Sequence, residues 1–142
     1  MKVTVGAWLD KDGDRNSREI LAAINLAKRN SNVIGVVVGN ETIYRGEQKV
    51  ENLIELIKRV KKSVNVPVTT GEIWNIWRDH PQLANSADFI AAHVLPYWEN
   101  FTDKQAVDQA VDLFAEQCRV YEEDDPQDVP ITGVNVRIMR VS

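Results

Sequence analysis

The sequence contains a single cysteine, Cys118, among its 142 residues, so no internal disulfide can form. Seven glycines and five prolines are too few for a collagen-like or linker protein. No run approaches the ~18 apolar residues of a membrane span, and the N-terminus shows no signal-peptide pattern. Basic residues are outnumbered, and the net charge of −4 argues against nucleic acid and membrane as partners. We therefore expect a soluble, cytoplasmic domain.

Hydrophobic residues make up 44% of the chain, which is enough for one packed domain. The continuous apolar run VIGVVV is typical of a strand buried on both faces. Asn16 and Glu19 have the spacing of a capping box at the start of the first helix. The alternation of strand and helix patterns predicts one mostly parallel α/β domain over residues 1–142. Strands are expected at 1–9, 33–38, 66–70, 88–95 and, more weakly, 129–141, and helices at 17–29, 47–62, 73–84 and 102–121.

Aromatic and acidic residues gather at the predicted carboxyl ends of the strands, where parallel α/β proteins bind their ligands. Indole faces stack on sugar rings, and paired carboxylates can cleave glycosidic bonds. The pattern therefore predicts a sugar-binding cleft, although Trp74 and Trp77, three residues apart, would equally suit a helix packed on the sheet. The polar and aromatic residues at or just after the predicted strand ends are Trp8, Asn40, Glu41, Glu72, Trp74, Trp77, His93, Tyr97, Trp98 and Glu99.

Glu41 is the strongest catalytic candidate. It directly follows the run VIGVVVGN, so it is expected to project from the end of a central strand into a partly dehydrated site, where a carboxyl group can act as a general acid. Asn40 beside it could donate an amide hydrogen bond to a sugar hydroxyl. The alternative is that Asn40 caps the next helix and Glu41 lies in its first turn.

Other common chemistries lack their motifs. His80 and His93 are the only histidines, and neither lies at metal-ligand spacing from the cysteine, so we expect no metal site. His93, near the end of an apolar strand, is expected to be a hydrogen-bonded core or rim residue. Gly35 and Gly39 fit no phosphate-binding pattern, and no nucleophile elbow surrounds a serine. We therefore expect no cofactor.

Four segments carry a family resemblance: GAWL, VVVGNETIYRGE, VPVTTGEIWNIW and DFIAAHVLPYWE. In this order they resemble the barrel of glycoside hydrolase family 17, whose members are β-1,3-glucan hydrolases and transglycosylases, over residues 2–99. The resemblance implies part of an eight-stranded (β/α)8 TIM barrel. In it, Glu41 would be the general acid/base and Asn40 would hydrogen-bond the sugar 2-hydroxyl. It also implies that the cleft is lined by Glu72, Trp74, His93, Tyr97 and Trp98, with Trp8 on the first strand.

The C-terminal segment, residues 122–142, departs from the family. The family's nucleophile is a second glutamate on strand seven, whereas the corresponding stretch here, PITGVNVRIMRVS, contains no carboxylate. The chain also has roughly half of the about 250 residues of a TIM barrel. Enzymatic activity is therefore uncertain, and three interpretations stay open. The chain could be a β-glucan-directed enzyme fragment completed by another chain, a non-catalytic carbohydrate-binding domain, or a half-barrel that forms homo-oligomers through its exposed sheet edges.

Overall fold

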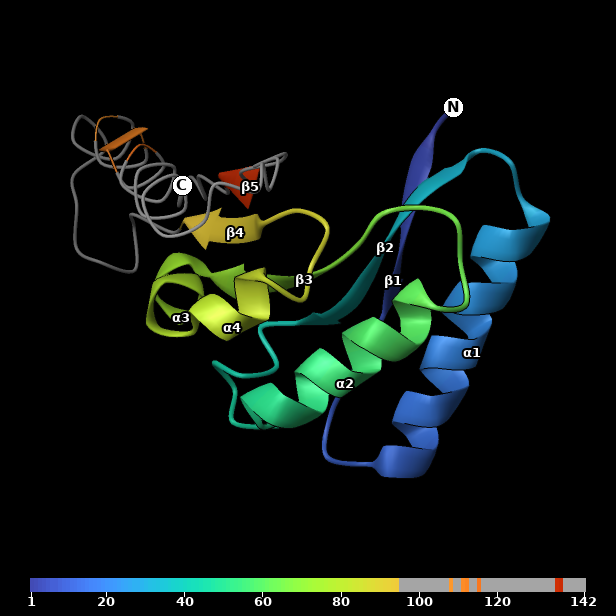
Figure 1. The fold of residues 1–142 in the computed structure, drawn as a ribbon, viewed down its shortest axis with the longest axis horizontal. Helices are drawn as coiled ribbons and strands as arrows, with labels where there is room; N and C mark the ends of the chain where they lie inside the picture. The colour runs from blue at the N-terminus through green and yellow to red at the C-terminus, as the bar shows by residue number, and fades with distance from the viewer. Residues whose placement is uncertain (95–107, 109–110, 113–114, 116–134, 137–142) are drawn as a thin grey trace, which may run out of the picture.

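The computed structural model describes residues 1–94, 108, 111–112, 115 and 135–136. Its strands form one parallel sheet in the order β1-β2-β3-β4-β5, and the first four alternate with helices along the chain (Figure 1). The predicted parallel α/β fold is thus confirmed. The strands are β1 (Val3–Ala7), β2 (Val33–Asn40), β3 (Val68–Ile73), β4 (Ala91–Val94) and β5 (Asn135–Val136). The helices are α1 (Gly13–Arg29), α2 (Val50–Lys61), α3 (Trp74–Asp79) and α4 (Pro81–Ala84).

The hydrophobic core lies between the sheet and the helices that pack on it. Helix α1 contacts β1 and β2, and α2 contacts β2 and β3 (Figure 1). Each helix presents one apolar face to the strands, as its spacing of apolar residues requires. The fully buried members of this core include Leu9, Ile20, Val36, Val38, Leu53, Ile57, Val60 and Val68.

Helix α1 begins earlier than the sequence pattern predicts. Its N-cap is Asp12, whose side chain accepts hydrogen bonds from the backbone N–H groups of Asp14 and Arg15. The predicted capping box of Asn16 and Glu19 is therefore wrong. The Asn16 side chain instead donates to the Asp10 carbonyl, and Glu19 accepts from the Trp8 N–H. Both side chains tie α1 to the segment that follows β1.

Strands β2 and β3 end later than the sequence pattern predicts, and β3 also starts later. Asn40 is the last residue of β2 and pairs with Gly71 of β3. Helix α2 begins only at Val50, after the N-cap Lys49, so the alternative in which Asn40 caps the next helix is wrong. The backbone of Asn40 is held in the sheet, and this places Glu41 directly beyond the strand end.

The segment after β3 forms two short helices in place of one. Helix α3 ends before His80, and α4 starts at Pro81. Proline disfavours a helical conformation in the residue before it, which explains the break. Trp77 is fully buried, and its indole N–H donates to the Ala91 carbonyl at 3.2 Å. The packing interpretation therefore holds for Trp77, whereas Trp74 remains partly exposed.

Several predictions concern residues outside the described part. Of the predicted helix 102–121, only Asp108, Val111, Asp112 and Ala115 are described, and all four are helical. Of the weak strand 129–141, only β5 is described. Tyr97 and Trp98 lie outside the described residues. Within the described part, no helix has the length and hydrophobicity to span a membrane.

Candidate active site

Glu41 occupies an unusual backbone conformation at the end of β2. Its φ of 53° lies in the left-handed region, which non-glycine residues seldom adopt and which often marks functional sites. Its N–H donates to the Gly71 carbonyl at 2.6 Å, and its own carbonyl accepts from the Arg45 N–H at 2.9 Å. Residues 41–45 therefore form a tight turn that is anchored to β3.

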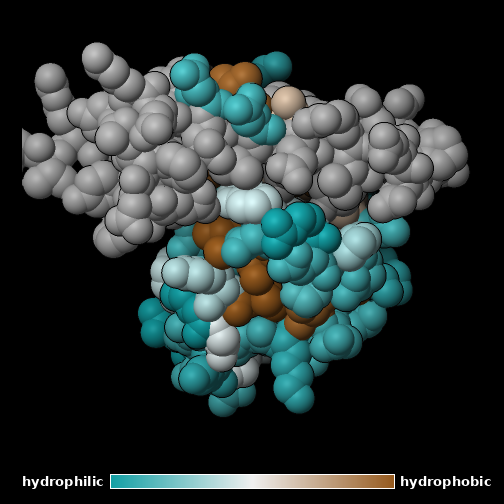
Figure 2. Space-filling view, turned by 90° about the vertical axis from the view of Figure 1, so that its left-hand side faces the viewer, coloured by the Kyte–Doolittle hydropathy of each residue, from teal (hydrophilic) through white to brown (hydrophobic). Residues whose placement is uncertain are grey.

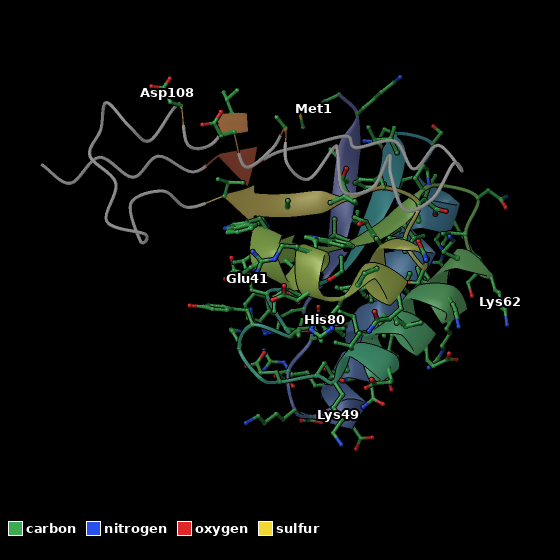
Figure 3. The ribbon with its side chains drawn as sticks, turned by 60° about the vertical axis from the view of Figure 1, so that its left-hand side comes forward. Met1, Glu41, Lys49, Lys62, His80 and Asp108 are labelled. Carbon is green, nitrogen blue, oxygen red and sulfur yellow. The ribbon has the colours of Figure 1, made fainter. Side chains whose placement is uncertain are left out.

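The Glu41 carboxylate meets the imidazole of His93. Its Oε1 lies 2.7 Å from Nδ1 of His93, so the two side chains are hydrogen-bonded. The side chains are 24% and 16% exposed, respectively. Figure 3 shows Glu41 at the end of the sheet toward which β4 points. The structure thus brings together two predicted site residues from β2 and β4, and His93 is hydrogen-bonded at the rim as expected.

Gly71 makes this contact possible by having no side chain. A Cβ atom at residue 71 would lie 3.1 Å from Nε2 of His93 and 3.3 Å from Oδ1 of Asn40. Both distances are tighter than ordinary van der Waals contact, so the side chains of Asn40 and His93 both lie close to the backbone of Gly71. Glycine inside a strand pattern often marks such a close approach, and this was the available sequence signal for its role.

Glu72 is fully buried beneath the turn that follows Glu41. Its Oε1 accepts the N–H of Ile43 at 2.8 Å and its Oε2 accepts the N–H of Tyr44 at 3.4 Å. Burial raises the pKa of the Glu72 carboxyl, the backbone N–H groups of the turn oppose this, and the charge of Glu41 adds to the rise. Glu72 therefore belongs to the predicted site region but faces backbone amides.

Two arginines lie against predicted sugar-binding tryptophans. The guanidinium of Arg45 lies over the Trp8 ring, 4.4 Å from its centre, and that of Arg78 lies 4.8 Å from the centre of Trp74. Trp8 is 45% exposed despite this contact. Neither arginine stood out in the sequence, although Arg45 belongs to the segment VVVGNETIYRGE.

Tyr44 is a further aromatic side chain in this region that the sequence did not single out. It lies in the turn after Glu41 and is 62% exposed. Figure 2 shows the face toward which β3 and β4 point, where a band of hydrophobic side chains runs between hydrophilic ones. Exposed aromatic rings near a partly exposed carboxyl group can hold a sugar while a proton is transferred.

The fold and the site together define a parallel α/β protein with an acidic residue at the carboxyl end of its sheet. Residues 1–129 match the family model described as the BtgE/BtgC glycoside hydrolase domain, and the chain belongs to this family. The predicted relationship to glycoside hydrolase family 17 is thereby confirmed at the family level.

Known relatives agree with this assignment. The chain is 31% identical over 110 residues to the btgC protein of Aspergillus niger, whose name describes a glucan endo-1,3-beta-glucosidase. That match covers 69% of this chain and 16% of the relative. The chain thus spans about a sixth of the length of the curated relatives it matches.

Two solved structures of a Rhizomucor miehei beta-1,3-glucanosyltransferase match the fold. An active-site mutant in complex with laminaritriose superposes with a TM-score of 0.78 at 28% identity, covering 94% of this chain and 49% of that one. A second structure, described as a glycoside hydrolase family 17 enzyme, gives 0.73 at 30% identity, with 82% and 44% covered. The described strands and helices therefore correspond to part of a family 17 barrel.

Proposed function

We propose that this chain carries the acid/base part of a β-1,3-glucan-directed active site, belonging to a hydrolase or a transglycosylase. Glu41 is the proton donor and acceptor. The observation that carries the proposal is the contact between the Glu41 carboxylate and Nδ1 of His93 at 2.7 Å, at the carboxyl end of the sheet. A partly exposed carboxyl group that is hydrogen-bonded to an imidazole can both give and take a proton at a substrate oxygen.

In the proposed reaction, Glu41 protonates the glycosidic oxygen as the leaving sugar departs. It then takes a proton from water in hydrolysis, or from a sugar hydroxyl in transfer. A retaining reaction also needs a nucleophilic carboxylate about 5–5.5 Å away. Among the described residues we assign that group to none, since Glu72 is buried against backbone amides, and the stretch PITGVNVRIMRVS contains no Asp or Glu.

The proposed ligand is a β-1,3-linked oligosaccharide. The exposed indole of Trp8 and the partly exposed indole of Trp74 would stack on sugar rings, and Asn40 and His93 would hydrogen-bond sugar hydroxyls. Tyr97 and Trp98 are proposed to line the same cleft. The binding of laminaritriose to the related Rhizomucor protein supports this choice of ligand.

The test measures laminaritriose binding by tryptophan fluorescence, together with the cleavage and transfer products of longer laminari-oligosaccharides. Glu41→Gln should keep the affinity for laminaritriose within about twofold and should lower turnover at least about 100-fold, the scale of a general acid. Glu55→Gln, on the exposed face of α2, is the matched control and should leave both unchanged. Equal turnover in wild type and Glu41→Gln would disprove the role of Glu41.

A non-catalytic glucan-binding function is the second candidate, and the exposed Trp8 ring with Arg45 beneath it favours this function. In that case laminaritriose binds, Trp8→Ala weakens binding about tenfold or more, and neither wild type nor Glu41→Gln gives products. Failure of laminaritriose to bind the wild-type protein would contradict both candidates.

We also propose self-association through the edge of the sheet. Within the described residues, β1 pairs only with β2, so its other edge presents unpaired backbone groups that readily pair with another chain. Light scattering at micromolar concentration should show a dimer or larger species. A monomer would argue against pairing at this edge.

A further inference from the structure

Glu72 is a fully buried carboxylate that the proposed reaction does not use. It lies on β3, and its two oxygens are directed at the backbone N–H groups of Ile43 and Tyr44. The burial of a carboxyl group costs free energy, and hydrogen bonds or ion pairs normally compensate that cost. Within the described residues, the hydrogen bonds of the Glu72 carboxylate go to the turn that begins with Glu41.

The turn itself needs to be held in place. Glu41 has a φ of 53°, a strained backbone conformation that a non-glycine residue keeps only where the surrounding structure enforces it. The N–H of Glu41 is fixed by the Gly71 carbonyl, and the N–H groups two and three residues later are fixed by Glu72. Two consecutive residues of β3 therefore hold the backbone on which the Glu41 side chain is mounted.

We propose that Glu72 is a positioning residue, whose carboxylate holds the amides of Ile43 and Tyr44 and thereby keeps Glu41 within hydrogen-bond distance of Nδ1 of His93, without contacting the sugar. The importance of this for catalysis rests on the proposed function, but the geometry can be tested without turnover. The competing role is the direct contact with substrate that the family resemblance implies for Glu72.

A carboxylate suits this task better than the corresponding amide. Its two oxygens are both acceptors, which matches two backbone donors. A glutamine at residue 72 would direct one oxygen at one N–H, and its NH2 group would face the other N–H, donor against donor. Aspartate keeps the charge but is one methylene shorter, so it would not reach both amides.

The test follows the imidazole of His93 by ¹⁵N NMR and the exchange of the Ile43 amide with deuterium. In Glu72→Gln, the amide should exchange about tenfold faster or more, and the His93 Nδ1 resonance should move toward its position in Glu41→Gln. Glu72→Asp should move both readouts in the same direction, because the cause is lost reach and not lost charge. Glu55→Gln is the control and should move neither.

Laminaritriose affinity separates positioning from direct contact. Positioning predicts an affinity within about twofold of wild type for Glu72→Gln, whereas loss of a direct hydrogen bond would weaken binding about tenfold or more. Any measurable turnover should fall in kcat with KM nearly unchanged. Weakened binding with an unchanged His93 resonance would overturn the proposal.

A measurement on the wild-type protein covers the case in which the variants do not fold. The Ile43 amide should be protected from exchange at least about tenfold relative to an unstructured peptide. An unprotected Ile43 amide would overturn the proposal on its own. Failure of the proposed function has a different signature: a wild-type protein without laminaritriose binding, but with Ile43 protected and with His93 responding to Glu72→Gln.

Discussion

The guanidinium of Arg45 lies over the indole ring of Trp8, and the same group donates to the carbonyl oxygens of Leu9 and Asn40. It also pairs with Glu47 at 2.6 Å. One side chain therefore connects the segment after β1, the end of β2 and the turn that contains Glu41. The orientation of the Trp8 ring and the backbone at Glu41 are set by a common contact.

Replacement of Arg45 should therefore affect stability as well as the Trp8 ring. Arg45→Gln removes charge-assisted hydrogen bonds to two carbonyl groups, and we expect a loss of about 1.5–3 kcal/mol in the free energy of unfolding. The tryptophan fluorescence spectrum should also change. Urea unfolding is the measurement, with the exposed Lys58→Gln as a control that stays within about 0.5 kcal/mol. A loss for Arg45→Gln no larger than that of the control would contradict this prediction.

Gly71→Ala tests the close approach of the Asn40 and His93 side chains to the backbone of β3. The new methyl group would lie 3.1 Å from Nε2 of His93, so the imidazole ring or the backbone of β3 must shift by a few tenths of an ångström. We expect a loss of about 1–3 kcal/mol in stability, as for other overpacked sites, and a shifted His93 resonance. Gly13→Ala is the matched control, because a Cβ there meets nothing within 4 Å and the residue opens α1. That variant should be neutral or slightly stabilised.

The raised pKa of Glu72 predicts a pH dependence of stability. Burial, the largest cause, lifts the folded-state pKa above the ordinary value of 4.5. The folded protein then binds more protons than the unfolded chain between these two pKa values. The contribution of Glu72 is therefore fully present below pH 4.5 and is lost as pH rises through the folded-state pKa.

The comparison of wild type with Glu72→Gln isolates this group. The stability difference, wild type minus variant, should decrease as pH rises above 4.5 and through the folded-state pKa. Urea unfolding at several pH values measures this difference. A difference that stayed constant, or that grew with pH, would show that burial does not raise this pKa.

Two buried threonines offer a contrast in hydrogen bonding. Within the described residues, the hydroxyl of Thr42 has no hydrogen-bond partner, whereas that of Thr69 donates to the Phe89 carbonyl. Thr42→Val should therefore be neutral or stabilising, and Thr69→Val should cost about 1 kcal/mol, since it removes the hydrogen bond to the partly buried Phe89 carbonyl. Equal effects of the two substitutions in urea unfolding would contradict this assignment of partners.

The sequence predicted the fold well because the alternation of buried strands and amphipathic helices is a strong pattern. It also placed Glu41 correctly, since a polar residue after a continuous apolar run must leave the sheet at its end. Local competition was harder to resolve. Asp12 and Asn16 are both suitable helix caps, and only the packing of Asn16 against Asp10 decides between them.

The environment of Glu72 was not recognised for a different reason. Side chains alternate along a strand, so Glu72 lies on the same face of β3 as Val68, a member of the hydrophobic core. Gly71, the residue before Glu72, lies on the opposite face of β3, which is the face toward His93. The predicted strand ended at residue 70, so the alternation of faces was not applied to Gly71 and Glu72.

Within the described residues, the contacts that fix Glu41 come from a continuous part of the chain, between Leu9 and His93. This block contains the backbone contacts of the turn and both partners of the contact between the carboxylate and the imidazole. One continuous segment of sequence therefore carries the whole arrangement. Transfer of that block into another barrel of this family should carry the geometry of the proton-transferring group with it, whichever segments supply the rest of the cleft.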